Sequence, residues 1–299
     1  MPVSSAALAA KRSDSLKEAD NAYFQGNMDG SIQLYEEAVR KNPGDAAGFQ
    51  SLGVTYAEKG SFDKSLDALL RAQELAPKNA QIMVNLSLVY GEKNDSGNAI
   101  LFAEKAIQAE PKKASAYHAL GLAYEGAKNI EKAEQSYQRG LGATPNDTDL
   151  LLALGNLYSR QRLVEKAVAV YEKVIAADPK NVFAYSNIAY AIEQKGDWDK
   201  ALIYLKRAAQ AAPEDDIVWF DLGRAYKEKN DLVNSLECFE KSQALNSKSY
   251  KTALSLAMMY EQVNNLEKAS EYYVKAMALT DNIKLKEAIL TQISKTTEE

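Results

Sequence analysis

A proline recurs every 34 residues through most of this chain. Six of the seven prolines belong to the series, which consists of Pro43, Pro77, Pro111, Pro145, Pro179 and Pro213. Proline has no backbone N–H and its ring clashes with the preceding helical turn, so it marks helix ends rather than helix interiors. Fixed periods of roughly 20 to 50 residues are typical of stacked repeat proteins. The spacing therefore predicts a chain of similar units, most of which end near a proline.

Counting each unit from 31 residues before its proline gives eight repeats, of which the last two lack the proline. The predicted boundaries are 12–45, 46–79, 80–113, 114–147, 148–181, 182–215, 216–249 and 250–283. Residues 1–11 remain as an N-terminal extension and residues 284–299 as a C-terminal segment. Leu285, Ile289 and Ile293 of that segment recur at i, i+4 spacing, which predicts a capping helix. Positions within a repeat are numbered 1 to 34 below.

Two positions of the repeat hold only small residues. Position 8 reads Ala19, Gly53, Ser87, Gly121, Gly155, Ala189, Gly223 and Ala257, and position 20 holds only alanine or serine. Small residues at fixed places let two helices approach closely. Large apolar residues at positions 4, 7, 11 and 24 complete the pattern of two antiparallel amphipathic helices per repeat, at positions 1–14 and 15–28. Trp219 at position 4 and Trp198 at position 17 are predicted to lie in the core.

Position 34, just before each first helix, holds residues that can cap a helix. These residues are Asp45, Asn79, Asp147, Asn181, Asp215 and Ser249. Their side chains can accept hydrogen bonds from the first exposed N–H groups of the helix that follows. Lys113 is the exception, so the helix after it is predicted to start less sharply.

The combined pattern resembles the tetratricopeptide repeat. It consists of Leu-Gly-x-x-Tyr at 52–56, 120–124, 154–158 and 222–226, a small residue at position 20, a frequent aromatic residue at position 24 and proline at position 32. The resemblance implies an all-α fold, a right-handed α-solenoid superhelix of tandem helix-turn-helix repeats with a C-terminal capping helix. It also implies a concave groove, lined by the first helices, in which a peptide or a helix of a partner protein lies.

In the repeat numbering, positions 2, 5, 9 and 12 form a stripe on the first helix that is rotated away from the core. With one residue at position 6, they give the predicted partner-binding residues Val54, Val84, Leu88, His118, Leu122, Leu152, Asn156, Phe183, Asn187, Tyr190, Phe220 and Arg224. A contiguous apolar strip with polar neighbours is a mark of a partner site. The alternative is that the valines and leucines pack between neighbouring first helices. Few charges are expected along this wall, so salt should affect binding little.

Chaperone-tail binders of this family hold a C-terminal carboxylate with lysines, asparagines and an arginine. Here only Asn156 and Asn187 match that clamp, and Asp221 stands where a basic residue would be needed. The resemblance to that subgroup therefore fails.

The sequence offers little material for catalysis. There is one histidine, His118, and one cysteine, Cys238, which excludes a site of two histidines or a thiolate cluster. The uninterrupted repeat also leaves no long loop that could gather catalytic groups. We therefore expect no catalytic residues, no metal site, no cofactor and no enzyme activity.

The predicted function is that of a non-catalytic interaction scaffold or adaptor in the assembly of a larger complex. A substrate-recruiting module for an enzyme on a separate chain is the alternative. The formal net charge of -5 and the absence of a basic repeat argue against nucleic acid as a partner, and no apolar stretch is long enough to span a membrane. A protein or peptide partner is expected, and self-association stays open. A single cysteine favours the cytoplasm, with a bacterial periplasm as the alternative if a signal peptide is removed.

Overall fold

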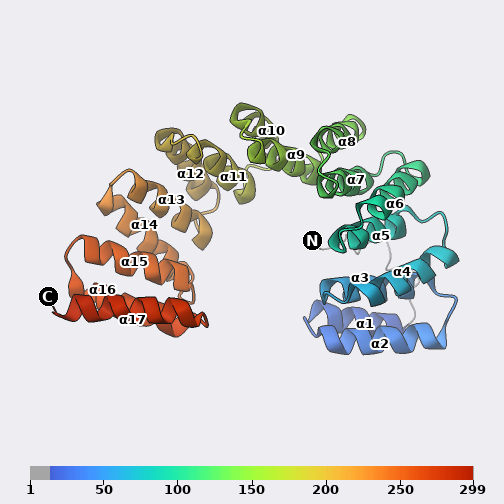
Figure 1. Ribbon diagram of the computed structural model, residues 1–299, viewed down its shortest axis with the longest axis horizontal. Coiled ribbons are helices and arrows are strands. Elements are labelled where there is room, and N and C mark those ends of the chain that lie inside the picture. The colour runs from blue at the N-terminus through green and yellow to red at the C-terminus, as the bar shows by residue number, and fades with distance from the viewer. Residues whose placement is uncertain (1–13, 299) are drawn as a thin grey trace. The chain divides into compact units, whose positions relative to one another are not determined.

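The computed structural model describes residues 14–298, and their regular structure consists of seventeen α-helices (Figure 1). They are α1 (Asp14–Phe24), α2 (Met28–Lys41), α3 (Ala46–Glu58), α4 (Phe62–Leu75), α5 (Ala80–Glu92), α6 (Ser96–Ala109), α7 (Ala114–Gly126), α8 (Ile130–Ala143), α9 (Thr148–Arg160), α10 (Val164–Ala177), α11 (Val182–Glu193), α12 (Trp198–Ala211), α13 (Asp216–Glu228), α14 (Leu232–Leu245), α15 (Tyr250–Gln262), α16 (Leu266–Leu279) and α17 (Ile283–Glu298). The predicted extension at residues 1–11 lies outside the described residues. The predicted all-α repeat solenoid is confirmed.

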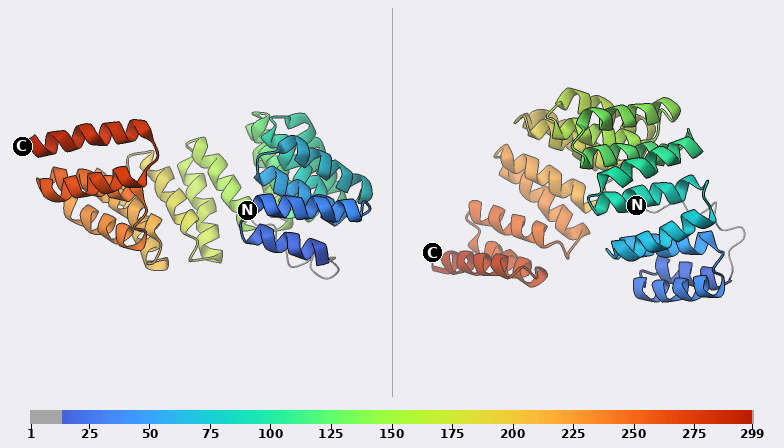
Figure 2. Two further views of the ribbon diagram at one scale, coloured as in Figure 1. Left: turned by 90° about the horizontal axis from the view of Figure 1, so that it is seen from below. Right: turned by 45° about the vertical axis from the view of Figure 1, so that its right-hand side comes forward.

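The chain divides into two compact units, which are described separately. Unit 1 ends at Leu154 and unit 2 begins at Gly155, within α9. Inside each unit, consecutive helices pack against one another, and the stacked pairs can be followed in Figures 1 and 2. Odd-numbered helices from α1 to α15 are the first helices of their repeats, and even-numbered helices are the second helices.

The helices fill different positions of the repeat from those predicted. Nearly all first helices run from position 1 to position 13, and the second helices run from position 17 to position 30. The predicted second helix, at positions 15–28, therefore began and ended two residues too early. The reason lies in the residue at position 15.

Position 15 adopts the left-handed backbone conformation in all eight repeats. The residues are Gly26, Gly60, Asn94, Lys128, Arg162, Gly196, Asn230 and Asn264, with φ between 58° and 78°. In repeat 2, the Gly60 N–H donates to the Ala57 carbonyl at 2.9 Å and the Ser61 N–H donates to the Tyr56 carbonyl at 2.8 Å. This pair of bonds is the Schellman arrangement that closes a helix C-terminus. A residue in this conformation cannot start a helix, so the second helix begins two residues later.

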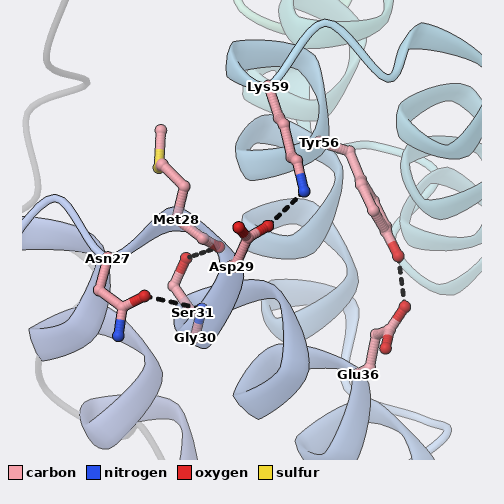
Figure 3. Close-up of polar contacts among 8 residues, drawn as sticks. All are labelled: Asn27, Met28, Asp29, Gly30, Ser31, Glu36, Tyr56 and Lys59. Atoms are coloured by element: carbon pink, nitrogen blue, oxygen red, sulfur yellow. Dashed lines mark hydrogen bonds and ion pairs between the residues drawn. The ribbon is translucent and has the colours of Figure 1, made fainter.

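Capping side chains hold both helices of a repeat. All six predicted caps at position 34 accept bonds from the following helix, as Asp45 does from the N–H groups of Ala47 and Gly48. Lys113 makes no such side-chain bond, but α7 still begins at position 1, so its start is not delayed. The sequence reading missed a second set of caps at position 16, made by Asn27, Asp95, Asn129, Asp197, Asp231 and Asn265. Figure 3 shows the Asn27 side chain accepting the Gly30 N–H.

The small residues at position 8 lie where the two helices of a repeat cross. A methyl group added at Gly53 would lie 2.6 Å from the side chain of Leu69, and one at Gly121 would overlap the ring of Tyr137. At the same crossing, the Ser65 hydroxyl at position 20 donates to the Gly53 carbonyl at 2.7 Å. The predicted close approach of helices at positions 8 and 20 is therefore confirmed.

The repeating proline also has a role in the joint to the next repeat. At three of these prolines the carbonyl accepts a hydrogen bond from an aromatic residue at position 4 of the following repeat: Tyr117 to Pro111 at 3.0 Å, Tyr185 to Pro179 at 3.3 Å and Trp219 to Pro213 at 2.8 Å. The Lys241 ammonium lies 3.7 Å from the centre of the Trp219 ring. Trp219 and Trp198 are only half-buried, so their predicted place in the core is wrong. Trp219 lies at the joint between repeats 6 and 7, where its indole edge meets a polar partner.

Ion pairs connect neighbouring repeats on the outside. A lysine at position 14 contacts a carboxylate at position 18 of the preceding repeat, and the pairs are Lys59–Asp29, Lys93–Asp63, Lys195–Glu165 and Lys229–Asp199. Figure 3 shows the first of these beside the bond from the Tyr56 hydroxyl to Glu36. Most of these side chains are exposed, so each pair contributes no more than about 1 kcal/mol.

The last helix, α17, packs against α16 with Ile289 buried and Leu285 and Ile293 partly buried. It begins at Ile283, one residue before the predicted start of the C-terminal segment. Its service as a cap for the last repeat stays a prediction. Among residues 14–298, none of the helices combines the length and the apolar character that a membrane span requires.

Candidate partner-binding surfaces

In unit 1, the predicted binding residues divide into exposed and buried groups. Leu88 on α5 and Leu122 on α7 are each 39% exposed, and Val54 on α3 is half-buried. These three residues all occupy position 9, and we call them the apolar row. Val84 is only 2% exposed and lies within the core cluster, so it cannot contact a partner, and its assignment to the binding surface is wrong. Val84 is therefore packed in the core, in line with the alternative reading of the valines and leucines.

A row of glutamates follows the apolar row one helical turn later. Glu58, Glu92 and Glu125 come three or four residues after Val54, Leu88 and Leu122 on the same helices. We call these carboxylates the acidic row. Glu58 and Glu92 occupy position 13 and Glu125 position 12, so Glu125 lies on the other side of the apolar row, about 100° around the helix from the place of the other two. The expectation that few charges line this wall is therefore wrong.

Two tyrosines, one of them in the core, restrain part of the acidic row. Tyr137 is fully buried, yet its hydroxyl donates to the Glu125 carboxylate at 2.7 Å. The Tyr23 hydroxyl donates to Glu58 at 2.6 Å. Each of these carboxylates therefore accepts a charge-assisted hydrogen bond that restrains its direction.

His118 and Leu152 are half-buried at position 5 of their repeats, in unit 1. The imidazole ring of His118 lies 6.1 Å from the ring of Tyr137. Burial lowers the pKa of His118, and the nearby carboxylates of Asp149 and Asp147 act in the opposite direction. His118 is therefore a neutral, partly covered side chain at neutral pH.

Unit 2 exposes larger apolar side chains than unit 1. Phe183 and Tyr190 on α11 are 73% and 57% exposed, and Ile217 on α13 is 57% exposed. Ile217, at position 2, was not among the binding residues predicted from the sequence. Phe220 behaves differently, because its ring packs 5.5 Å from the core ring of Phe239.

The predicted polar residues of unit 2 are already engaged with each other. Asn156 accepts hydrogen bonds at one oxygen from the Tyr171 hydroxyl at 2.6 Å and from the Asn187 amide at 3.2 Å. Arg224 lies 2.8 Å from the Glu193 carboxylate, whose side chain is only 6% exposed. Burial raises the pKa of Glu193, and Arg224 opposes that rise. These side chains therefore hold neighbouring first helices together as well as lining the surface.

A cleft of about 520 Å³ opens between α15 and α17 in unit 2. Its walls are mainly apolar, with Glu261, Gln262 and Gln292 as polar members. The apolar members are Leu254, Met258, Leu285, Ala288 and Ile289. The sequence reading did not find this cleft, because it treated the C-terminal segment only as a cover for the last repeat.

Within residues 14–298, no three histidine, cysteine, aspartate or glutamate side chains are grouped as a metal ion would require. Cys238 is buried, and burial raises the pKa of its thiol to about 12, which keeps it in the unreactive protonated form.

Family models described as "Tetratricopeptide repeat" match residues 16–80 and 152–216, residues 80–113, 114–147 and 217–249, and residues 252–287. No curated protein matches the chain.

Two solved structures share the fold at low sequence identity. One belongs to a study of pilF from Pseudomonas aeruginosa, with 14% identity, a TM-score of 0.54, and coverage of 71% of this chain and 97% of that chain. The other is a tetratricopeptide repeat protein from Parabacteroides merdae ATCC 43184, with 19% identity, a TM-score of 0.53, and coverage of 89% and 99%. At these identities the likeness concerns the fold alone.

Proposed function

Because the chain belongs to the tetratricopeptide repeat family, we propose that it is a non-catalytic scaffold that binds a segment of a partner protein on its first helices. Tetratricopeptide repeats generally mediate protein–protein interactions. The segment is a helix or an extended peptide, and the binding serves the assembly of a larger complex, in the cytoplasm.

The observation that carries this proposal is the exposure of large apolar side chains on the first helices of both units. Leu88 and Leu122 in unit 1, and Phe183, Tyr190 and Ile217 in unit 2, are exposed on well-formed helices whose other faces are packed. Folding does not require these residues to be apolar, because positions 2 and 9 lie outside the core pattern of the repeat. Clustered exposed apolar groups of this kind mark interaction sites.

A photo-crosslinking amino acid placed in the living cell can test the surface and identify the partner together. We expect a crosslinker at Leu122 or Tyr190 to capture a defined protein, found by mass spectrometry. A crosslinker at Glu104 on α6 or Ile203 on α12, both exposed on second helices, should not capture it. Capture only from the second helices would move the binding site to the outer face. If the captured protein is an enzyme, the chain is a substrate-recruiting module instead of an assembly scaffold.

The partner found in this way then permits a quantitative test with Leu122→Asp. Burying an apolar side chain is worth about 1.5–3 kcal/mol, so the substitution should weaken binding at least about tenfold. Because Leu122 is exposed, the helical circular dichroism and its thermal midpoint should be nearly unchanged. An unchanged affinity, together with loss of binding on charge reversal in the second helices, would overturn the proposal.

A further inference from the structure

Repeat 6 differs from its neighbours at the joint with repeat 5, inside unit 2. Position 11 holds tyrosine in repeats 2, 3, 4, 5, 7 and 8, but in repeat 6 it holds Ile192. All six tyrosines are buried or half-buried, and so is Ile192. Isoleucine has neither the aromatic ring nor the hydroxyl group of tyrosine. The groups that contact the ring in other repeats therefore meet a different side chain in repeat 6.

Repeat 8 shows the fullest set of contacts around the tyrosine at position 11. The Tyr260 ring stacks on the ring of Tyr272, at position 23, with the two centres 5.6 Å apart. The Lys268 ammonium, at position 19, lies 4.8 Å from the centre of the Tyr260 ring. The Tyr260 hydroxyl donates to the carboxylate of Glu240, at position 25 of the preceding repeat. A second ring, a cation and a hydrogen-bond acceptor thus surround this tyrosine.

Parts of the same set recur at other joints. In repeats 2, 4 and 5, a lysine at position 19 lies between 5.2 and 5.4 Å from the centre of the position 11 ring. In repeat 3, the ring of Phe102, at position 23, stacks on Tyr90 at 5.5 Å. In repeat 2, the Tyr56 hydroxyl donates to Glu36, at position 25 of the preceding repeat (Figure 3). Positions 19, 23 and 25 are thus the places from which the chain contacts an aromatic ring.

Repeat 6 keeps all three of these groups, although position 11 carries no ring. Lys200 stands at position 19, Tyr204 at position 23 and Glu172 at position 25 of repeat 5. The Tyr204 hydroxyl donates to Glu172 at 2.9 Å, so this carboxylate already accepts a bond from a phenol. Lys200 pairs with Asp197 at 2.9 Å, and its side chain is 70% exposed. An exposed pair of this kind is weak, so Lys200 can turn towards a ring at little cost.

A pocket of about 320 Å³ lies at this place, between α10 and α12. The three groups described above all line it. Its apolar walls come from Val164, Val168, Ala169 and Ile192. Ligand pockets have volumes of about 300–1,000 Å³, so this pocket has room for one aromatic side chain.

We infer that this pocket binds the side chain of a tyrosine carried by a partner protein. The ring lies against Ile192 and Tyr204 with the Lys200 ammonium over its face, as the chain's own tyrosines lie in other repeats. Its hydroxyl donates to Glu172, which can accept from Tyr204 as well because a carboxylate has two oxygens. A protein is the source because tetratricopeptide repeats generally bind proteins.

This site lies beyond the proposed function, which concerns the exposed side chains of the first helices. The pocket is built mainly by the second helices α10 and α12. Failure of one proposal therefore leaves the other standing, and the crosslinking experiment decides the proposed function separately.

The test uses the full-length protein with isotope-labelled isoleucine and valine methyl groups, whose NMR signals report on Ile192 and Val168. One probe is para-cresol, which is the tyrosine side chain alone. The other is 4-methylcyclohexanol, which keeps the hydroxyl group but has no aromatic face. Para-cresol should shift both methyl signals with a Kd in the millimolar range, at least about fivefold tighter than 4-methylcyclohexanol. Equal binding of the two probes, or no shift at these methyl groups, would overturn the inference.

A matched pair of variants assigns the binding to the pocket. Ile192→Tyr places the chain's own ring there, as in six other repeats, and should abolish the shift of Val168 by para-cresol. Its thermal midpoint should be unchanged or higher, so a loss of stability would show that the pocket does not hold a ring. Ile203→Tyr adds the same side chain at an exposed site on α12 outside the pocket, and it should leave para-cresol binding unchanged.

Short peptides identify the source of the ring. A glycine peptide with one central tyrosine should bind at least as tightly as para-cresol, and its phenylalanine counterpart should bind several-fold more weakly because it cannot donate to Glu172. Equal binding of the two peptides would refute the selection of tyrosine. Binding of para-cresol without binding of the tyrosine peptide would make the pocket a site for a small phenol and refute a protein source.

Discussion

Unit 1 exposes Leu88 and Leu122 beside a row of glutamates, whereas unit 2 exposes Phe183, Tyr190 and Ile217 around an arginine–glutamate pair. Each repeat in both units consists of two helices that cross closely. The residue at position 15 between them has a left-handed backbone conformation throughout. The positions that set the fold, such as 8, 15, 20 and 24, are thus separate from positions 2, 9, 12 and 13, which differ between the units. One repeat can therefore carry two different surfaces on one chain.

The two units can also be observed separately, because both tryptophans, Trp198 and Trp219, lie in unit 2. Tryptophan fluorescence reports the unfolding of unit 2, while far-ultraviolet circular dichroism reports the helices of both units. Contacts in a repeat protein are mostly between neighbours, so a substitution in one unit should change mainly the stability of that unit. Fluorescence and circular dichroism together should then show which unit has changed.

The largest effect is expected for Gly121→Leu at the helix crossing of repeat 4. Because a side chain there would overlap the ring of Tyr137, the substitution should destabilise unit 1 by about 2–4 kcal/mol. The midpoint of denaturation should fall by circular dichroism and much less by tryptophan fluorescence. Gly142→Leu is the control, because a side chain at Gly142 meets open space, and it should leave stability unchanged or slightly raised. Equal shifts in both signals would show that the two units unfold as one.

An intermediate effect is expected for Arg224→Met in unit 2. Removing the arginine leaves the buried carboxylate of Glu193 without its ion pair, which should cost about 2 kcal/mol at pH 7. This loss should appear in tryptophan fluorescence.

The loss caused by Arg224→Met should also depend on pH. The pKa of Glu193 is raised in the folded state and rises further without Arg224, so the folded protein takes up a proton more readily than the unfolded chain. As the pH falls through this raised pKa towards the ordinary value of 4.5, protonation stabilises the variant and the loss shrinks. The double variant Arg224→Met/Glu193→Gln should lack this pH dependence. A loss that stays constant from pH 7 to pH 5 would mean that the unpaired carboxylate is not its cause.

A smaller effect, of opposite sign, is expected where a long side chain occupies position 15. Lys128→Gly in unit 1 and Arg162→Gly in unit 2 should each stabilise their own unit by about 0.5–1 kcal/mol, because glycine adopts the left-handed conformation without strain. Circular dichroism should report the first gain and tryptophan fluorescence the second. Glu104→Gly, inside α6, should instead destabilise unit 1 by about 1 kcal/mol. A loss of stability in either position 15 variant would contradict the assigned backbone conformation.

The sequence predicted those features that depend on one residue type at one position. Pro77 ends a repeat, Gly53 lies at a crossing and Asp45 caps a helix for reasons that act locally, and all of them were found. The start of the second helix was misplaced because Lys128 and Arg162 do not signal a left-handed turn as glycine does. It takes the hydrogen bonds of the finished turn to force these residues into that conformation.

The binding surface was only partly predictable, because burial depends on neighbouring repeats. Val84 and Leu88 look alike in the sequence, yet the first is buried in the seam with a neighbouring helix and the second is exposed. The hydrogen bonds that Glu58 and Glu125 accept from Tyr23 and Tyr137 could not be predicted either, because they join different helices.

The ion pairs between neighbouring repeats make the order of the repeats matter. Where position 14 of a repeat is lysine, position 18 of the preceding repeat is always a carboxylate. In repeat 4, position 14 is Ala127, and position 18 of repeat 3 is Gly97. Deleting repeat 2 would place Lys93 opposite Asp29, so the joint would be re-formed. Deleting repeat 3 would place Ala127 opposite Asp63 and leave that carboxylate unmatched. A deletion or exchange of repeats therefore keeps some of these ion pairs and loses others, each worth no more than about 1 kcal/mol.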